Sequence, residues 1–263
     1  MGILNTTPDS FSDGGLHTDL NPAVSHAMMM ISEGADIIDV GGESTRPGAA
    51  AVSLEVELER TIPVIRVLRK SWDGFISIDT SKAVVASAAL AAGADIVNDV
   101  TGFQGDPAMP EVCAAAGCGV VVMHMQGNPA TMQTAPAYGN LIPDIMNFFE
   151  ERLSALSAAG IDLESVCLDP GIGFGKSHHH NLEILRELDR FQRLNRPIMV
   201  GLSRKSFIGR ILRSSAIEDR EWPTVALTSL AREKGAMVHR VHSVKTNRQA
   251  LRMTEAILAT ASP

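Results

Sequence analysis

The stretch FISIDTSKAVVASAALAAGADIVNDV, residues 75–100, contains a complete strand–helix–strand unit. Its two ends, FISIDT (75–80) and ADIVNDV (94–100), are short, rich in β-branched residues and apolar at both odd and even positions. Strands that are covered on both faces have this composition, which favours a parallel sheet over an antiparallel one. The alanine-rich segment between them has helical spacing and ends at a glycine, Gly93, which suits a helix C-cap.

The same unit recurs along the chain. Similar strand-like runs lie at residues 1–5, 35–42, 75–80, 94–100, 119–125, 166–171, 197–203 and 237–243. Eight alternations of strand and helix within 263 residues predict an α/β fold, a single (β/α)8 TIM barrel that occupies residues 1–263 as one domain. A doubly wound open sheet is the alternative, but eight units without a dinucleotide fingerprint favour closure.

Composition narrows the class of protein. The formal net charge of −7 argues against a nucleic-acid partner, because proteins that bind nucleic acid usually carry a basic face. No apolar run reaches the roughly 18 residues of a membrane-spanning helix, and no leader precedes the first motif. We therefore expect a cytoplasmic protein that acts on small molecules.

The glycine-rich segment LDPGIGFGKS (168–177) resembles a phosphate-binding loop only superficially. A P-loop requires a glycine five residues before Gly175, and that position is Pro170. The dinucleotide fingerprint fails as well, because its third glycine would fall on His178. The glycines are better explained as allowing the backbone to pass close to a planar ligand and to set Phe174 over it.

Polar residues follow almost every predicted strand. They are Asn5, Asp39, Asp79, Asn98 with Asp99, His124, Asp169, Ser203 to Lys205, and Arg240 with His242. In a barrel these C-terminal ends converge on one mouth, where barrel enzymes hold their chemistry. Each residue alone could be an ordinary turn or N-cap residue, but so many together predict a ligand site.

The charges of these residues indicate a ligand with two different parts. Asp79, Asn98 and Asp169 suit the amino-pyrimidinone edge of a flat heterocycle, and Met123 and Phe174 could cover its faces. A second group is cationic and suits phosphate or diphosphate; it consists of Arg46, Arg204, Lys205, Arg240 and His242. The loops at 5–15 and 42–52 are longer than usual βα loops, which is typical of binding loops.

Several motifs, in order and spanning nearly the whole chain, carry a specific resemblance. They are MGILNTTPDSFSDGG, DIIDVGGESTRPGA, SIDTSK, VNDVTG, VMHMQGNP, LDPGIGFGKSHHHNLEIL, VGLSRKSFIG and RVHSV. This set resembles the dihydropteroate synthase family of folate biosynthesis. The methyltetrahydrofolate methyltransferases, which are distant pterin-binding relatives, lack STRPG and SRKSF.

The resemblance implies a transferase that condenses 6-hydroxymethyl-7,8-dihydropterin diphosphate with 4-aminobenzoate, with Mg²⁺, and that is a sulfonamide target and a homodimer. It assigns the pterin pocket to Asp79, Asn98, Met123, Asp169, Phe174, Gly201 and Lys205. It assigns the diphosphate to Asn5, Thr45, Arg46, Arg240 and His242, with Asn5 also near the metal. The aminobenzoate is assigned to Thr45, Arg46, Pro47, Phe174, Lys205 and Ser206. The residues expected to act in catalysis are Asp79, Lys205, Arg240 and His242.

The chain departs from the family pattern at two places. Ser243 stands where the family usually has Asp in R-V-H-D-V, and Pro223 stands where it usually has Gly. Proline is acceptable in the first turn of a helix, whereas Ser243 puts the tuning of the diphosphate site in doubt. Two alternatives stay open: a methyltransferase that needs a corrinoid partner, and a catalytically silent paralogue that still holds pterin.

Three motifs are interpreted without a function. His178, His179 and His180 are consecutive, so they point in different directions and are expected to form a solvated loop rather than a metal site. Met28 to Met30 are expected to pack within a helix. The acidic residues of LEVELER (54–60) are expected to form a solvated helix face.

Overall fold

The computed structural model describes residues 1–6, 20–44, 51–127 and 131–260. Eight parallel strands form one sheet in sequence order. They are β1 (Gly2–Asn5), β2 (Ile37–Gly41), β3 (Phe75–Asp79), β4 (Ile96–Asp99), β5 (Gly119–Met123), β6 (Val166–Asp169), β7 (Ile198–Val200) and β8 (Ala236–His239). Seven lie within the runs that the sequence predicted, and β8 begins one residue before its predicted run at 237–243, so the parallel α/β class is confirmed.

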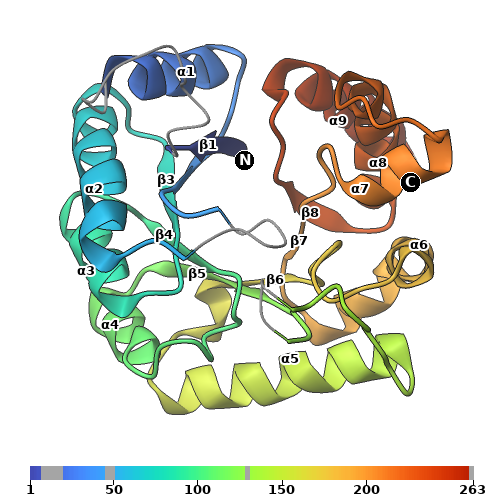
Figure 1. Ribbon diagram of the computed structural model, residues 1–263, viewed down its shortest axis with the longest axis horizontal. Coiled ribbons are helices and arrows are strands. Elements are labelled where there is room, and N and C mark those ends of the chain that lie inside the picture. The colour runs from blue at the N-terminus through green and yellow to red at the C-terminus, as the bar shows by residue number, and fades with distance from the viewer. Residues whose placement is uncertain (7–19, 45–50, 128–130, 261–263) are drawn as a thin grey trace.

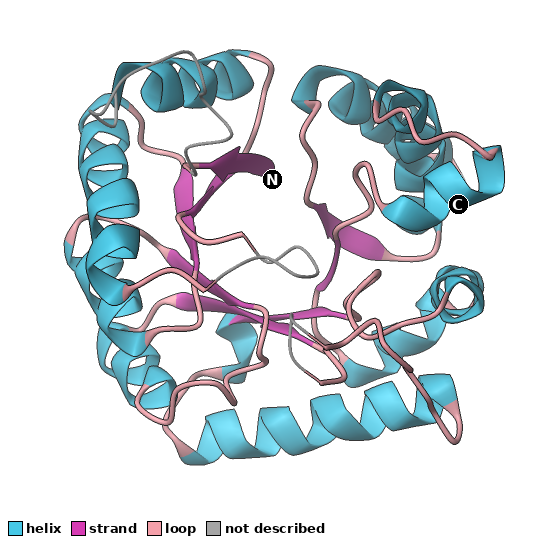
Figure 2. Cartoon of the chain, in the orientation of Figure 1, coloured by secondary structure: helices cyan, strands magenta, loops and turns pink. Residues whose placement is uncertain are grey.

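Helices separate the strands and lie around the outside of the sheet (Figures 1 and 2). They are α1 (Leu20–Ser32), α2 (Leu54–Ser71), α3 (Ala83–Ala91), α4 (Met109–Ala116), α5 (Leu141–Ala158), α6 (His178–Arg186), α7 (Ser206–Leu212), α8 (Glu221–Glu233) and α9 (Val244–Ala259), with short 3-10 turns at Leu163–Ser165, Leu188–Leu194 and Glu218–Arg220. The layer between sheet and helices is apolar; Ile38, Ile76, Val97 and Leu168 are completely buried there.

Backbone hydrogen bonds also join β1 to the segment that follows β8. The Ile3 N–H donates to the Val241 carbonyl at 3.0 Å, and the Val241 N–H donates to the Met1 carbonyl at 2.9 Å. Gly2 and Val241 form a parallel bridge. The first and last strands of the series are therefore connected through Val241.

Two of the three motifs to which the sequence assigned no function differ in structure from the prediction. The three histidines do not form a loop but begin α6, because Ser177 caps the helix: its hydroxyl accepts from the His180 N–H, and the His180 ring accepts from the Ser177 N–H. The prediction for the acidic helix face was wrong at Glu57, which is completely buried. Glu57 is buried because Lys82 forms ion pairs with it and with Glu43.

The third motif is only partly a packing surface. Met30 is completely buried against the sheet, whereas Met28 and Met29 on the same helix are exposed.

Gly117 ends α4 and has the positive φ of 61° expected of a left-handed residue at the end of a helix.

Candidate active site at the C-terminal ends of the strands

The register of the first four strands brings polar residues into one row. Asn5 on β1 pairs with Gly41 on β2, Gly41 pairs with Asp79 on β3, and Asp79 pairs with Asn98 on β4. Residues in register on neighbouring strands point to the same face. Because Gly41 has no side chain, Asn5 Oδ1 and Asp79 both lie close to it: a Cβ there would be 3.9 Å from Asn5 Oδ1 and 3.7 Å from Asp79 Oδ2.

Arg240 ties this row to a deeper carboxylate. Its Nε donates to Asp39 Oδ2 at 2.6 Å and its Nη2 donates to Asp79 Oδ2 at 2.7 Å. Asn98 Nδ2 donates to the same Asp39 oxygen at 3.3 Å. The other oxygen of each carboxylate, Asp39 Oδ1 and Asp79 Oδ1, is buried and accepts no hydrogen bond from the residues that the structure describes.

Burial controls the charges of this network. Burial raises the pKa of Asp79 to about 7, and the Arg240 guanidinium offsets part of that effect. Burial alone would lower the pKa of Arg240, but the carboxylates of Asp39 and Asp79 raise it. The site therefore holds a permanent cation beside a carboxyl group that can take up or release a proton near neutral pH.

The second half of the site is built by β5, β6 and the loop after β6. Met123 and Asp169 are in register at the ends of β5 and β6, and both are buried. Asp169 Oδ1 accepts the Gly171 N–H at 2.7 Å, which fixes the start of the glycine segment. Further along, the half-buried ring of Phe174 lies under Lys205, whose Nζ is 4.2 Å from the ring centroid.

The glycine segment approaches β5 and Lys205 closely. A Cβ on Gly171 would overlap the His124 carbonyl oxygen, and a Cβ on Gly173 would lie 3.2 Å from Lys205 Cδ. Both glycines also have positive φ, 69° and 83°. These positions therefore favour glycine through their backbone conformation and their close approach to His124 and Lys205, whereas the expected approach to a planar ligand stays a prediction.

Lys205 and Asp169 are opposite charges in the same region. Burial lowers the pKa of Lys205 to about 8, and Asp169 raises it in part. Burial raises the pKa of Asp169, while the Gly171 N–H and the Lys205 charge lower it. Lys205 follows Arg204, which has a positive φ of 59° and whose N–H donates to Thr224 Oγ1 at 3.2 Å.

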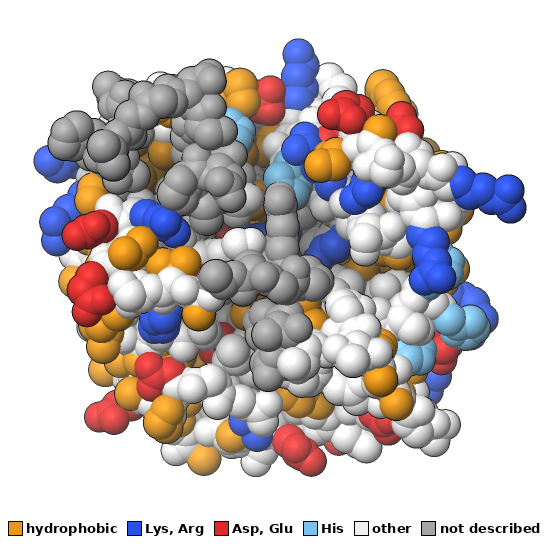
Figure 3. Space-filling view, viewed as in Figure 1, with side chains coloured by type: hydrophobic (Ala, Val, Ile, Leu, Met, Phe, Trp, Pro, Cys, Tyr) orange, Lys and Arg blue, Asp and Glu red, His pale blue; other side chains and the backbone are white. Residues whose placement is uncertain are grey.

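The residues after β7 and β8 complete the rim. His242 Nδ1 lies 2.9 Å from Ser203 Oγ, and the His242 N–H donates to the same hydroxyl at 3.2 Å. Ser206 is exposed and begins α7. At Gly201, no atom of the described chain lies within 4 Å of the position that a Cβ would take. Lys, Arg and His atoms are visible around the centre of the face in Figure 3.

Comparison with known protein families identifies the family of this chain. A model of the pterin binding enzyme family matches residues 1–242. The chain belongs to this family.

Its relatives are dihydropteroate synthases. The Escherichia coli K12 enzyme of that name is 48% identical over 259 residues, which are 98% of this chain and 91% of the relative. The crystal structure of the Yersinia pestis enzyme with a sulfonamide drug complex is 44% identical, with a TM-score of 0.93 over 98% of this chain and 93% of that one. The Xanthomonas albilineans enzyme in complex with 7,8-dihydropteroate is 40% identical, with a TM-score of 0.88 over 100% of this chain and 93% of that one.

Most of the predicted family residues lie together at this rim. Asn5, Asp79, Asn98 and Arg240 form its first half, and Met123, Asp169, Phe174, Gly201, Lys205, Ser206 and His242 follow the later strands. Thr45, Arg46 and Pro47 lie outside the described residues. Within the described chain, no group of three or more His, Cys, Asp and Glu residues could hold a metal ion.

Asp99, another polar residue at a strand end, has an ordinary structural role. Its carboxylate accepts from the N–H groups of Thr101 and Phe103 and so stabilises the turn after β4. Asp39 was not predicted as a site residue. Asp39 was noted only as a strand-end residue, and nothing in the sequence pairs it with Arg240, 201 positions away.

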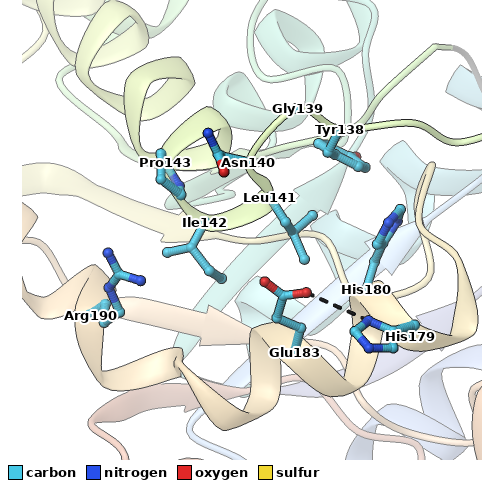
Figure 4. Close-up of a pocket in the computed structure, with 10 residues that line it drawn as sticks. All are labelled: Tyr138, Gly139, Asn140, Leu141, Ile142, Pro143, His179, His180, Glu183 and Arg190. Carbon is cyan, nitrogen blue, oxygen red and sulfur yellow. Dashed lines mark ion pairs between the residues drawn. The ribbon is translucent and has the colours of Figure 1, made fainter.

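A cavity of about 380 Å³ lies between the start of α5 and α6 (Figure 4). It is lined by the start of α5, Tyr138 before it, and residues of α6. His179 and Glu183 lie on its edge with His179 Nδ1 3.6 Å from Glu183 Oε2. The cavity contains none of the strand-end residues, so it is not the candidate active site.

No helix in the described part of the chain is both long and apolar enough to cross a membrane.

Proposed function

We propose that this chain is a dihydropteroate synthase that joins 6-hydroxymethyl-7,8-dihydropterin diphosphate to 4-aminobenzoate, with release of diphosphate. The observation that carries this proposal is the buried row of Asp79 and Asn98 beside Arg240, with Asp169 in the same mouth. Burying unmatched carboxylate oxygens is costly. A ligand that donates several N–H groups compensates that cost, and a pterin has such an edge.

The pterin ring would bind between the two halves of the rim. Asp79 and Asp169 would accept from ring N–H and amino groups, and the Asn98 amide can both donate and accept. Phe174 and Met123 would cover the faces of the ring, and the open space at Gly201 would admit its edge. The Lys205 ammonium over Phe174 would donate to an acceptor of the ring.

The diphosphate would lie beside Arg240 and His242. The Arg240 guanidinium keeps Nη1 for a phosphate oxygen, because only Nε and Nη2 donate to carboxylates in the described chain. Thr45 and Arg46, on the loop after β2, would complete this subsite. The aminobenzoate would lie near Lys205, Phe174 and Ser206, and the family resemblance assigns Thr45, Arg46 and Pro47 to it as well.

The donor set fits Mg²⁺ as a partner of the diphosphate rather than as an ion in an all-protein cage. Asn5 Oδ1, which lies close to Gly41 and Asp79, offers one hard oxygen. Mg²⁺ is commonly held by one or two protein oxygens together with substrate phosphates and water. When bound, it would neutralise charge on the departing diphosphate.

The reaction would proceed by early departure of diphosphate. The positive charge that develops on the pterin methylene spreads into the ring, where Asp79 and Asp169 stabilise it. Arg240 and His242 stabilise the leaving group. Each such prearranged group lowers the activation free energy by on the order of 3–4 kcal/mol. The amine of the second substrate is neutral at pH 7, so its main requirement is orientation.

Two further properties belong to the proposal. We infer that the sheet closes as a (β/α)8 barrel, supported by the bonds from β1 to Val241. A homodimer through the late helices is supported by exposed apolar residues on α8 and α9, namely Trp222, Met253 and Ile257. Sedimentation at several concentrations tests the dimer.

The decisive experiment measures dihydropteroate and diphosphate together, with both substrates and Mg²⁺. One equivalent of diphosphate for each dihydropteroate supports the proposal. Diphosphate release without Mg²⁺ at the rate measured with Mg²⁺ would contradict the proposed role of the metal. Tight pterin binding without turnover would instead identify the silent paralogue, for which Ser243 is the motivating residue. Ser243 directly precedes α9 without a side-chain cap hydrogen bond, and its hydroxyl accepts from Thr246. Pro223 lies in the first turn of α8, as predicted.

A further inference from the structure

Lys176 is a buried lysine that has no assigned role in the site described above, and burial lowers its pKa to about 7. The residue is only 2% exposed. Its Nζ lies 2.9 Å from His124 Nδ1 and donates to the carbonyl oxygens of His124 at 3.1 Å and Phe174 at 2.9 Å. None of these three contacts is with a carboxylate. Burying an ammonium group is unfavourable, so stability alone is a weak reason for a lysine here.

The three contacts join two different strand ends. His124 follows β5, whereas Phe174 and Lys176 follow β6. The His124 ring is itself held by the edge-to-face ring of Phe148, at a centroid distance of 4.9 Å. Burial and the Lys176 charge lower the pKa of His124 to about 2, so the imidazole is neutral and its Nδ1 can accept. Lys176 thus connects a fixed element of the sheet to the glycine segment.

Several hydrogen bonds besides those of Lys176 hold the glycine segment. The Gly173 N–H donates to Asn181 Oδ1 at 2.7 Å, Gln133 Nε2 donates to the Gly173 carbonyl at 2.6 Å, and the Phe174 N–H donates to the Gly171 carbonyl at 3.0 Å. Gly171, Gly173 and Gly175 all have positive φ, and glycine backbone is intrinsically the least restricted. Asp169 fixes the start of the segment through the Gly171 N–H, and the Tyr138 hydroxyl donates to the Gly175 carbonyl at 2.8 Å. Lys176 holds the Phe174 carbonyl itself, and so the backbone that carries the ring under Lys205.

We propose that Lys176 is a positioning residue for pterin binding: it ties residues 171–175 to β5 and thereby holds the Phe174 ring against the pterin. This inference rests on the proposed function, since it assumes that Phe174 covers the ring. It implies that loss of the Lys176 amino group weakens the pterin subsite more than the aminobenzoate subsite, because both Asp169 and Phe174 at this segment are assigned to the pterin, whereas only Phe174 is assigned to the aminobenzoate as well.

The test compares Lys176→Met with Arg69→Met. Arg69 is a matched control because it also donates to several backbone carbonyls, those of Trp72, Gly74 and Gly93, but before β3 and β4. In Lys176→Met we expect the Kd for 6-hydroxymethylpterin, measured by calorimetry, and the KM for the pterin diphosphate to rise at least about tenfold. The KM for aminobenzoate should change less than about threefold. In Arg69→Met the melting temperature should fall while both KM values stay within about twofold.

Pterin affinity within about twofold of wild type in a folded Lys176→Met protein would overturn the proposal. If that variant does not fold, Lys176→Gln, which keeps an uncharged amide donor group, decides in the same way with a smaller expected rise. A wild-type chain that binds pterin without turnover contradicts the proposed function alone, and the binding comparison still decides the role of Lys176. A wild-type chain that binds no pterin overturns both.

Discussion

At the N-terminal ends of the strands, arginines donate to the segments that precede β3, β4 and β6, whereas at the C-terminal ends Arg240 donates to two buried carboxylates. Arg69 bonds three carbonyls and Asp95, and Arg196 bonds the Leu163 carbonyl and Glu164. Asp95 also accepts the Ile76 N–H at 2.8 Å. These N-terminal contacts satisfy backbone groups and are partly exposed to water, so their effect is on stability.

The C-terminal network has the opposite character. Asp39 is completely buried, Asp79 nearly so, and each has an oxygen without a hydrogen bond from the described residues. A network built only for stability would satisfy these atoms, because each unmatched buried oxygen costs on the order of 1–3 kcal/mol. The difference teaches that the same residue type has a structural role at one end and a binding role at the other, as expected for this fold.

The largest effect is expected from Arg240→Met. It leaves the carboxylates of Asp39 and Asp79 buried without their cation, and breaking a buried ion pair from one side costs about 3–5 kcal/mol of stability. Chemical denaturation should show this loss, and dihydropteroate formation should disappear. A variant as stable as wild type would contradict the buried network.

Asp79→Asn keeps the shape of the side chain but removes its charge. We expect the rate of dihydropteroate formation to fall by about 10²–10³-fold, equivalent to about 3–4 kcal/mol, because the carboxylate no longer stabilises the developing cation. Steady-state kinetics with a circular dichroism control measures this. A rate within about fivefold of wild type would remove Asp79 from the catalytic set.

Arg69→Met is the matching change at the N-terminal end. Its loss of charged hydrogen bonds to Gly93, Trp72 and Gly74 should cost about 2–3 kcal/mol in the free energy of unfolding. Turnover of the folded protein should be unchanged. Impaired turnover at full folding would show that the two ends are coupled and would break the comparison.

The sequence predicted much of this arrangement because strand ends of a parallel sheet converge. Asp79, Asn98 and Asp169 could be placed at one rim from their positions after apolar runs. The pairing of Arg240 with Asp39 could not, since it joins residues 201 positions apart and depends on the length and direction of a side chain. Glu57 was assigned to solvent for a similar reason: its partner Lys82 lies on another element.

Stability should depend on pH through Asp79. Its pKa is raised by burial from 3.8 to about 7, so the folded state retains a proton that the unfolded state releases. Between these values the stability contributed by Asp79 therefore falls as pH rises, by up to about 1.4 kcal/mol per pH unit. Asp79→Asn cannot ionise, so its stability relative to wild type should increase from pH 5 to pH 7. If the difference in unfolding free energy between the two proteins stays constant across this range, the pKa of Asp79 is not raised in the folded state.

The smallest effect is expected at an exposed ion pair of the N-terminal end. Arg196 Nη2 lies 2.6 Å from Glu164 Oε1, but the Glu164 side chain is 80% exposed. Water and salt screen such a pair, so Glu164→Gln should change the free energy of unfolding by less than about 1 kcal/mol. Arg196→Met should cost more than Glu164→Gln, because Arg196 Nη1 also donates to the Leu163 carbonyl at 2.5 Å. Equal losses in the two variants would mean that the ion pair, rather than the bond to the backbone, stabilises this end.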